Sequence, residues 1–424
     1  MTGSRSTPFL LFLLLLPVLL LAQPAEEIDW HYEIDLLGRE LAQKHCNLFY
    51  QTDSTIFFSA LDHVADRTSE QSLFDISVQL QQVIASMGDA HTCINYHFNI
   101  DAGTILPLDC YWFEDGIYIL RVRIEYQEIL GKKLTGINGF PLEQIIDSLA
   151  TLIVNDNPYL FKSQFPRMIT WTPLLDHFGF GDQNGYELEY EDEQGTLERV
   201  FVKFPEEDGE VVNVQPEKLP LGWQDKKSYF RDHYFPEEQI YYIQYNKCWS
   251  REAEETHGSG ASALFMPSFK EFEKQVFQTI KKQKIDKLVF DMRFNGGGNS
   301  AQGTKFIKKL TKSRFKGAGD FYVIVGRQTF ASAIINTVDF MKNSEAVIVG
   351  EGTGGRPNHY GEVKRFVLPE SKLVVNYSTK YFTLLEDDLP SISPDIETPI
   401  HFEQFLKGTD PAMEAIRNHL FLQN

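Results

Sequence analysis

The sequence predicts an α/β protein in which a layered core follows a small helical N-terminal domain and a β-rich module. Three features of the chain support this organisation. Apolar residues at three- and four-residue spacing across 27–88 indicate helices. Short β-like runs, separated by glycine, proline and acidic turns, fill 101–206. From about residue 228 apolar strands alternate with amphipathic helices, which is typical of a layered α/β domain.

The N-terminus predicts a secretory signal peptide over residues 1–22. Residues 9–22 form an apolar run that is too short for a permanent membrane span, and small residues follow near Ala22 and Ala25. We therefore expect an exported protein, placed in the periplasm or cell envelope or secreted, with no stable membrane span after cleavage. An uncleaved anchor is the alternative.

Changes in composition divide the rest of the chain into four expected parts. These are a helical N-terminal domain at 26–100, a β module at 101–206, a charged linker at 207–227 and an α/β core at 228–424. The core is expected to contain strands at 240–246, 287–293, 320–326 and 345–351, helices at 266–284, 301–310, 332–343 and 411–422, and a hairpin at 364–382.

The charge and the cysteines restrict the classes of partner. A net charge of −19 disfavours nucleic acids and anionic membrane surfaces, because both are bound through basic patches. The cysteines fit no zinc motif and are too few for a disulfide scaffold. One or two bridges and buried free thiols are equally compatible with the pattern, which consists of Cys46, Cys93, Cys110 and Cys248.

Three successive glycines, 296–298, directly follow a buried apolar strand. Glycine loses more backbone freedom on folding than other residues, so such a run indicates backbone that bends sharply or approaches another group closely. A second turn, ending at Ser332, follows the next strand of the same domain. Turns at the carboxyl ends of neighbouring strands meet in one crevice. Gly297 or Gly298 can therefore present an N–H group opposite that of Ala333, forming an oxyanion hole.

Ser332 at the start of a helix has two interpretations. It is an N-cap, the usual role of a serine there, or a nucleophile whose developing charge the helix N-terminus stabilises. Phosphate binding is a competing use of a glycine-rich turn before a helix. The sequence, however, lacks the Lys–Ser/Thr pair of a P-loop and the spacing of a dinucleotide fingerprint.

Several motifs carry a family resemblance. The segments "LVFDMRFNGGG", "FASA", "AVIVGEGTGGRPN" and "SPDIETPI" resemble, in order and spacing, those of C-terminal processing (tail-specific) serine proteases, a family that includes the tricorn protease core. The segment "MGDAHTCINY" at 87–96 resembles an element of the tricorn-like branch. The resemblance implies a crotonase-like ββα core, a PDZ-like module that includes 104–146, and peptide hydrolysis through an acyl-enzyme without a metal or organic cofactor.

The resemblance also implies catalytic roles. Ser332 matches the nucleophile, and the oxyanion donors are those already named. Where the lysine-dependent branch has its base, this chain has Arg356, which stays protonated and cannot act as a base. The tricorn-like branch uses a histidine, matched here by His91, which can take the serine proton and return it to the leaving amine. A histidine that caps the preceding helix is the alternative.

Further candidates surround this set. The family has an acidic residue before the "PD" element, and Asp388 or Glu386 matches it here; a solvated acidic loop is the alternative. His359 is the rival base, because its loop is expected to border the same crevice. Arg356 suits a bidentate contact with a substrate carboxylate or a structural ion pair.

The assignments predict an exported serine peptidase that processes or degrades protein C-termini or peptides. The alternative is an inactive peptide- or ligand-binding protein on the same scaffold, because the lysine is missing and Ala90 replaces the serine found beside the tricorn-like histidine. An esterase-like acyl transferase is a weaker third hypothesis. Because His91 lies far from Ser332 in the sequence, a homo-oligomer in which it serves a neighbouring subunit also stays open.

Overall fold

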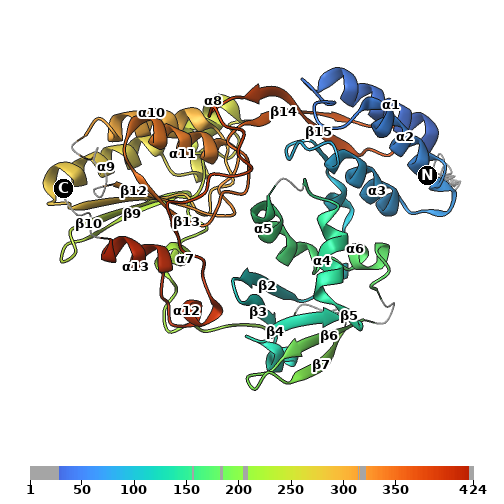
Figure 1. The fold of residues 1–424 in the computed structure, drawn as a ribbon, viewed down its shortest axis with the longest axis horizontal. Helices are drawn as coiled ribbons and strands as arrows, with labels where there is room; N and C mark the ends of the chain where they lie inside the picture. The colour runs from blue at the N-terminus through green and yellow to red at the C-terminus, as the bar shows by residue number, and fades with distance from the viewer. Residues whose placement is uncertain are drawn as a thin grey trace, which may run out of the picture.

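The computed structural model describes residues 28–154, 157–181, 185–203, 209–313, 315 and 321–419. The predicted signal peptide lies outside these ranges. The described residues form three sheets with helices around them, a mixed α/β architecture as the sequence predicts. Figure 1 shows blue N-terminal helices, a cyan and green β-rich region, and a yellow-to-red C-terminal core. No helix of this described part has the length and apolarity needed to cross a bilayer.

The core is a six-stranded sheet in the order β16-β13-β12-β11-β10-β9, parallel except for β9. Helices cover both faces, so the central strands are almost wholly buried. Helices α9, α10 and α11 lie on one face and α13 on the other (Figure 1). The bounds are β9 Phe230–Phe235, β10 Ile240–Tyr245, β11 Lys287–Asp291, β12 Phe321–Val325, β13 Val347–Gly350, β16 Ile396–Glu397, α9 Phe269–Lys282, α10 Ser300–Leu310, α11 Ser332–Asn343 and α13 Pro411–Asn418.

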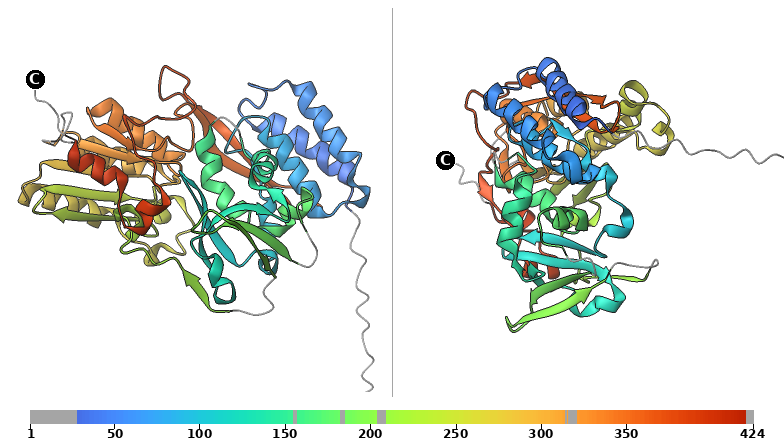
Figure 2. Two further views of the ribbon diagram at one scale, coloured as in Figure 1. Left: turned by 60° about the horizontal axis from the view of Figure 1, so that its bottom comes forward. Right: turned by 90° about the vertical axis from the view of Figure 1, so that its right-hand side faces the viewer.

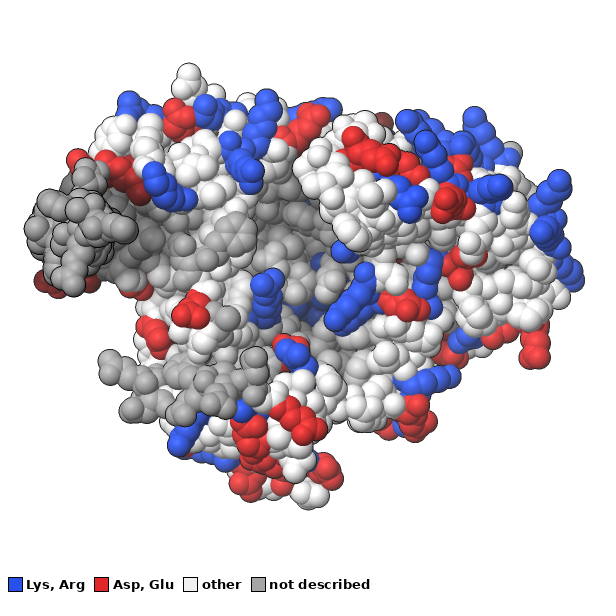
Figure 3. All heavy atoms as spheres, turned by 180° about the vertical axis from the view of Figure 1, so that it is seen from behind, with Lys and Arg blue, Asp and Glu red and all other residues white. Residues whose placement is uncertain are grey.

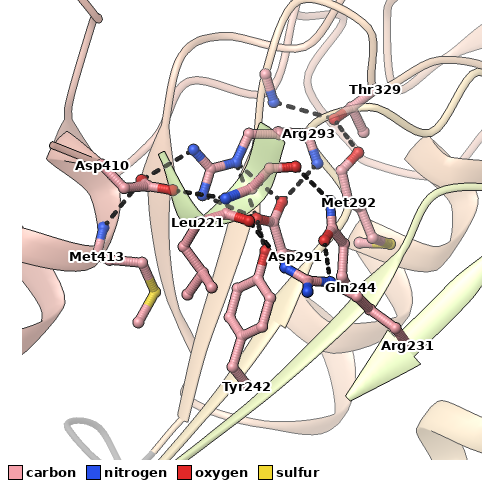
Figure 4. A network of polar contacts seen from close by, with 12 residues as sticks. Leu221, Arg231, Tyr242, Gln244, Asp291, Met292, Arg293, Thr329, Asp410 and Met413 are labelled. Carbon is pink, nitrogen blue, oxygen red and sulfur yellow. Dashed lines mark hydrogen bonds and ion pairs between the residues drawn. The ribbon is translucent and has the colours of Figure 1, made fainter. Parts of the chain in front are cut away.

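A buried ion cluster fastens α13 to the carboxyl end of β11 (Figure 4). The Arg293 Nε donates to Asp291 at 2.9 Å, and its Nη1 donates to Asp410, the N-cap of α13, at 3.0 Å. Burial alone would lower the pKa of Arg293, but the two carboxylates raise it well above its ordinary value. Burial alone would raise the pKa of Asp410, but Arg293 lowers it. The cluster thus fixes the strand end from which the glycine turn departs.

The N-terminal region contains the α-helices α1, α2 and α3. The third begins with a capping box, in which Ser72 and Asp75 each bond to the other's backbone N–H. After it, the chain makes a turn that contains His91 and enters the short strand β1. The bounds are α1 Trp30–Lys44, α2 Ser54–Ala65, α3 Leu73–Ala85 and β1 Cys93–Ile94.

A long hairpin from the core reaches across to these helices (Figures 1 and 2). It consists of β14, His359–Val367, and β15, Val374–Phe382. Strand β1 pairs antiparallel with β15, with Cys93 opposite Asn376. The hairpin thereby joins residues 93–94 to the C-terminal half of the chain and brings the neighbouring His91 turn to the core.

Helix α1 holds the turn of this hairpin. The buried Glu33 carboxylate accepts hydrogen bonds from the backbone N–H groups of Glu370 and Ser371, at 2.6 and 3.2 Å, and from the Ser371 hydroxyl at 2.6 Å. Apolar residues of the hairpin, such as Val375, belong to the same hydrophobic cluster as Leu37 of α1. The hairpin is therefore a structural part of the N-terminal region.

The middle region is an antiparallel sheet in the order β2-β3-β4-β6-β7, with β5 added to β4 and β8 to β3. The sequence did not predict helices α5 and α6. In α5, Pro166 lies inside the helix and obscures its helical pattern. The segment predicted as a linker contains β8 and α7. The bounds are β2 Leu108–Phe113, β3 Gly116–Arg123, β4 Lys133–Ile137, β5 Phe140–Pro141, β6 Tyr186–Glu191, β7 Leu197–Val202, β8 Val211–Asn213, α4 Leu142–Ala150, α5 Pro158–Met168, α6 Thr172–His177 and α7 Leu221–Gln224.

Candidate active site

The glycine turn after β11 lies against the start of α11. Gly297 and Gly298 have φ angles of +103° and +135°, which L side chains rarely adopt. A Cβ on Gly297 would lie 2.9 Å from the Ala331 Cβ, and one on Gly298 would lie 2.5 Å from the Cys248 carbonyl oxygen. Gly296, by contrast, has open space at its Cβ position. The second and third glycines are therefore required by both conformation and close approach.

Ser332 is the first residue of α11 and lies beside this turn. Its Oγ donates a hydrogen bond to the Gly298 carbonyl at 2.6 Å, so the hydroxyl bonds across the site and does not cap its own helix. The preceding residue, Ala331, has φ +50° and ψ −117°. This conformation is strained for a non-glycine residue and is of the kind found at functional sites.

The three expected oxyanion donors differ in their surroundings. The Gly297 N–H donates to Asn295 Oδ1 at 2.9 Å, and the Ala333 N–H donates to the Phe330 carbonyl at 3.0 Å. The Gly298 N–H has no acceptor among the described residues. Of the three, the Gly298 N–H is the one that is available to a ligand without breaking a hydrogen bond.

Asn295 ties the two turns together. Its backbone carbonyl accepts from Phe330 N at 3.0 Å, and its Nδ2 donates to the Tyr245 carbonyl at 2.8 Å. The buried thiol of Cys248 lies 3.5 Å from Asn295 Oδ1. All four cysteines are free, and Cys248 alone is fully buried.

His91 reaches this site from the N-terminal region. Its ring stacks on Phe330 at a centroid distance of 4.7 Å and on His359 at 5.7 Å. Burial lowers the pKa of His91 to about 4, with Asp89 opposing and His359 adding to the fall. At neutral pH the imidazole is therefore uncharged and able to accept a proton. Among the described contacts, no hydrogen bond joins His91 to Ser332.

Asp89 is a functional candidate that the sequence interpretation missed. It is buried, accepts from the His91 backbone N–H at 2.9 Å, and lies 3.9 Å from His91 Nδ1. It also accepts from His45 Nε2 at 3.0 Å and from the Thr92 hydroxyl at 2.5 Å. Burial alone would raise the pKa of Asp89, but these hydrogen bonds lower it to about 2. The sequence did contain a signal for this residue, because Asp89 lies two residues before His91 in the segment "MGDAHTCINY".

His359 occupies the same cavity at the start of β14. Its Nδ1 lies 3.0 Å from the Pro357 carbonyl, which can only accept, so Nδ1 carries the proton and Nε2 bears the lone pair when the ring is neutral. Burial lowers the pKa of His359, with the hydrogen bond to Pro357 opposing. His359 thus keeps the chemical requirements of a base.

Neither acidic candidate makes a hydrogen bond or ion pair with His91 or His359 among the described residues. Asp388 Oδ2 accepts from Arg356 Nη2 at 2.8 Å, and both side chains line the cavity. This ion pair gives Arg356 a carboxylate partner within the chain. Glu386 is exposed and is absent from the cavity wall. Asp89, in contrast, is in direct contact with the histidine segment.

These side chains surround a cavity of about 360 Å³ beside Ser332. The His91 turn, the turn before Ser332 and the segments that carry His359 and Asp388 contribute to it, whereas the glycine turn and Ser332 itself lie outside its lining. The part of the chain that the structure describes contains no group of three side chains suited to hold a metal ion. The lining includes Tyr50, Asp89, His91, Phe330, Ala331, Ile334, Arg356, His359, Tyr360, Tyr381 and Asp388.

Comparison with known proteins gives similarity at the level of the fold. No protein-family profile and no curated protein sequence matches the chain. Mature CPAF complexed with lactacystin matches with a TM-score of 0.61 and 13% identity, covering 92% of this chain and 96% of that one. Mature CPAF alone gives 0.60 and 13%, covering 92% and 95%.

Lower-scoring matches include the photosystem II D1 C-terminal processing protease, with a TM-score of 0.42 and 11% identity over 91% of this chain and 99% of that one. Tricorn protease matches with a TM-score of 0.40 and 11% identity over 92% of this chain and 36% of that one. The chain thus has a fold similar to that of CPAF.

Proposed function

We propose that this chain is a serine peptidase in which Ser332 is the nucleophile. The observation that carries the proposal is the contact between Ser332 and the glycine turn, in which the residues have positive φ. The cavity next to this contact is lined by two histidines, His91 and His359, whose pKa values are lowered. Acyl transfer needs a positioned nucleophile and donors for the oxyanion. Here the strained backbone at Ala331 and the buried Asn295 position Ser332 at the N-terminus of α11. The fold similarity to mature CPAF agrees with this function.

In this mechanism, substrate binding frees the Ser332 hydroxyl from the Gly298 carbonyl. His91 takes the proton as Ser332 Oγ attacks the peptide carbonyl, and Asp89 holds the histidine segment in place. The Gly298 N–H, together with the Ala333 N–H once it leaves Phe330, stabilises the oxyanion. His91 then protonates the leaving amine, and water, activated by the same histidine, hydrolyses the acyl-enzyme.

The finer predictions enter here as parts of the proposal. The parallel six-stranded sheet is the crotonase-like core, and the antiparallel sheet with α4 and α5 is the PDZ-like module. The four-part division of the mature chain, export after signal cleavage, and processing of protein C-termini also belong to the proposal. Arg356 with Asp388 borders the substrate cavity, and His359 assists or replaces His91.

A catalytically inactive binding protein is the second candidate. It is favoured by the hydrogen bond that occupies the Ser332 hydroxyl and by the two donor N–H groups that already have acceptors. Catalytic hydrogen bonds are often absent without substrate, so both functions fit this geometry.

Fluorophosphonate labelling of the mature protein separates the two candidates. We expect covalent labelling that is lost in Ser332→Ala and strongly reduced in His91→Asn. Ser300→Ala, at the first position of neighbouring α10, is the matched control and should label like the wild type. Absence of wild-type labelling, with and without added peptide, would exclude the peptidase. Hydrolysis of esters but not of amides would indicate the acyl-transferase alternative.

A further inference from the structure

A second, larger cavity lies between the middle region and the core. It has a volume of about 780 Å³ and is walled by β2, β3, α5, residues 213–219 and the segment after α7. Figure 3 shows one face of the molecule, on which Lys and Arg side chains border a central hollow. We call this cavity the basic cleft, because its lining contains six cations, namely Arg121, Lys162, Arg167, Lys226, Lys227 and Arg327, and a single carboxylate, Asp109.

Most of this positive charge is not neutralised by ion pairs with the described residues. Arg121 pairs with Asp109 at 2.7 Å, and Arg327 pairs with Glu351. The remaining four cations have no ion-pair partner among the described residues. This accumulation of unpaired cations contrasts with the chain as a whole, which has a net charge of −19.

Aromatic rings hold three of the four unpaired cations in place. Cation–π contact orients a head group but leaves its charge uncompensated, so each cation stays available to an anion. The contacts, given from the cation to the ring centroid, are Lys162 to Trp112 at 5.9 Å, Arg167 to Trp171 at 5.2 Å and Lys226 to Trp223 at 4.6 Å.

The cations stand on two walls of the cleft. Lys162 and Arg167 belong to α5, whereas Lys226 and Lys227 follow α7. Desolvation lowers the pKa of Lys226 and the adjacent charge of Lys227 lowers it further, with Asp109 opposing in part. An anion between the walls would relieve this repulsion. At physiological salt the field of distant acidic residues is screened within ~8 Å, so the local cations dominate inside the cleft.

A third cavity lies between the basic cleft and the cavity beside Ser332 and shares lining residues with both. This connecting cavity, of about 370 Å³, shares Ser163 and Arg167 with the cleft, and it shares Asp89 and Ala90 with the cavity beside Ser332. Its wall is largely apolar and includes Leu152, Val154, Leu160, Met168 and Trp171. The three cavities are thus neighbours in a row, with the largely apolar one in the middle and the basic one at the far end from Ser332.

We propose that the basic cleft binds acidic side chains of a polypeptide substrate, several residues along the chain from the bond that Ser332 attacks. The substrate part of this inference rests on the proposed peptidase function, whereas the binding part does not. Asp or Glu residues pair with Lys162, Arg167, Lys226 and Lys227, and the apolar residues between them and the scissile bond occupy the connecting cavity.

Binding to the Ser332→Ala protein tests the inference without requiring catalysis. The probes are two fluorescent peptides with amidated C-termini, identical except that one carries a run of glutamates and the other a run of glutamines. Fluorescence anisotropy should show about ten-fold tighter binding of the glutamate peptide at low salt, and the difference should shrink as salt is added. Equal affinities would overturn the proposal.

Matched charge variants locate the site. Replacing Lys162, Arg167 and Lys226 with Gln should abolish the preference for glutamate. Replacing the exposed Lys274, Lys281 and Lys282 of α9 with Gln makes the same change in net charge and should preserve it. A preference retained by the cleft variant overturns the assignment.

Two further binding measurements identify the ligand. If only a peptide with a free C-terminal carboxylate binds, the ligand is that terminus and the side-chain proposal is wrong. Equal competition by single-stranded DNA would indicate a general polyanion site and would also overturn it. If the glutamate preference is found and the wild type hydrolyses neither peptide, the peptidase function fails while the acidic-ligand site stands.

Discussion

The backbone at the candidate nucleophile is held in a costly conformation. Ala331 has φ +50°, and a non-glycine residue in such a region costs about 1–3 kcal/mol. The Gly297 N–H and the Phe330 N–H are both bonded to Asn295, which stabilises the two turns on either side of Ser332. At the scale of single residues, the site thus consists of one strained turn at Ala331 and one glycine turn, joined by the buried Asn295.

The glycine turn provides a test with an internal control. Gly298→Ala would force a side chain into a φ of +135° and against the Cys248 carbonyl, displacing the Gly298 N–H. We expect fluorophosphonate labelling to slow by about 10²–10³-fold, the usual cost of one oxyanion donor. Gly296→Ala, which has open space, should stay within about two-fold of the wild type. Wild-type labelling by a folded Gly298→Ala protein would argue against an oxyanion role.

The histidine environment predicts the pH dependence of labelling. If His91 is the base, the rate should rise as the pH increases through about 4, because the imidazole must be uncharged. Asp89 raises the pKa of His91, so Asp89→Asn should move the inflection to lower pH. His359 lowers that pKa, so His359→Asn should move it to higher pH. Loss of labelling in His359→Asn, with His91→Asn unaffected, would instead make His359 the base.

At the scale of elements, the sequence predicted those strands, helices and turns that depend on patterns of neighbouring residues. The apolar strands β10 to β13, the amphipathic helices between them and the glycine turn follow from residue types that occur close together in the chain. Helix α5 was not predictable in this way, because Pro166 lies inside it. The pairing of β1 with β15 and the contact of His45 with Asp89 depend on residues distant in sequence, for which no local pattern exists.

The ion cluster at the end of β11 should be a stability element. Arg293→Ala leaves Asp291 and Asp410 as buried carboxylates without their cation, which typically costs about 3–5 kcal/mol in unfolding free energy. Arg39→Ala, which breaks an exposed pair with Asp35, should cost less than about 1 kcal/mol. Urea unfolding measures both.

The pH dependence of the cluster has a defined sign. The pKa of Asp410 is lowered in the folded state, so its contribution is present above the unfolded pKa and is lost as the pH falls. Arg293→Ala should therefore reduce the loss of stability on acidification. An unfolding free energy that matches the Arg39→Ala variant at neutral pH would show that the cluster is dispensable.

At the scale of the whole molecule, the N-terminal helices and the C-terminal hairpin form one unit. Glu33→Ala removes the acceptor of three hydrogen bonds at the hairpin turn and leaves the buried Ser371 N–H and the partly buried Glu370 N–H without this acceptor. We expect about 2–4 kcal/mol of destabilisation in urea and slower labelling of Ser332, since His91 depends on the same unit. Glu40→Ala, in the partly exposed pair with Lys44, is the control and should change neither quantity appreciably.

The strand pairing between β1 and β15 has a consequence for biosynthesis. Residues 93–94 leave the ribosome early, but their partners at 375–376 emerge only when most of the chain has been made. The β1–β15 pairing that brings the His91 turn to the core can therefore form only late in synthesis, after residues 375–376 have emerged. If Ser332 and His91 act together as proposed, a chain truncated before residue 375 should show no activated serine.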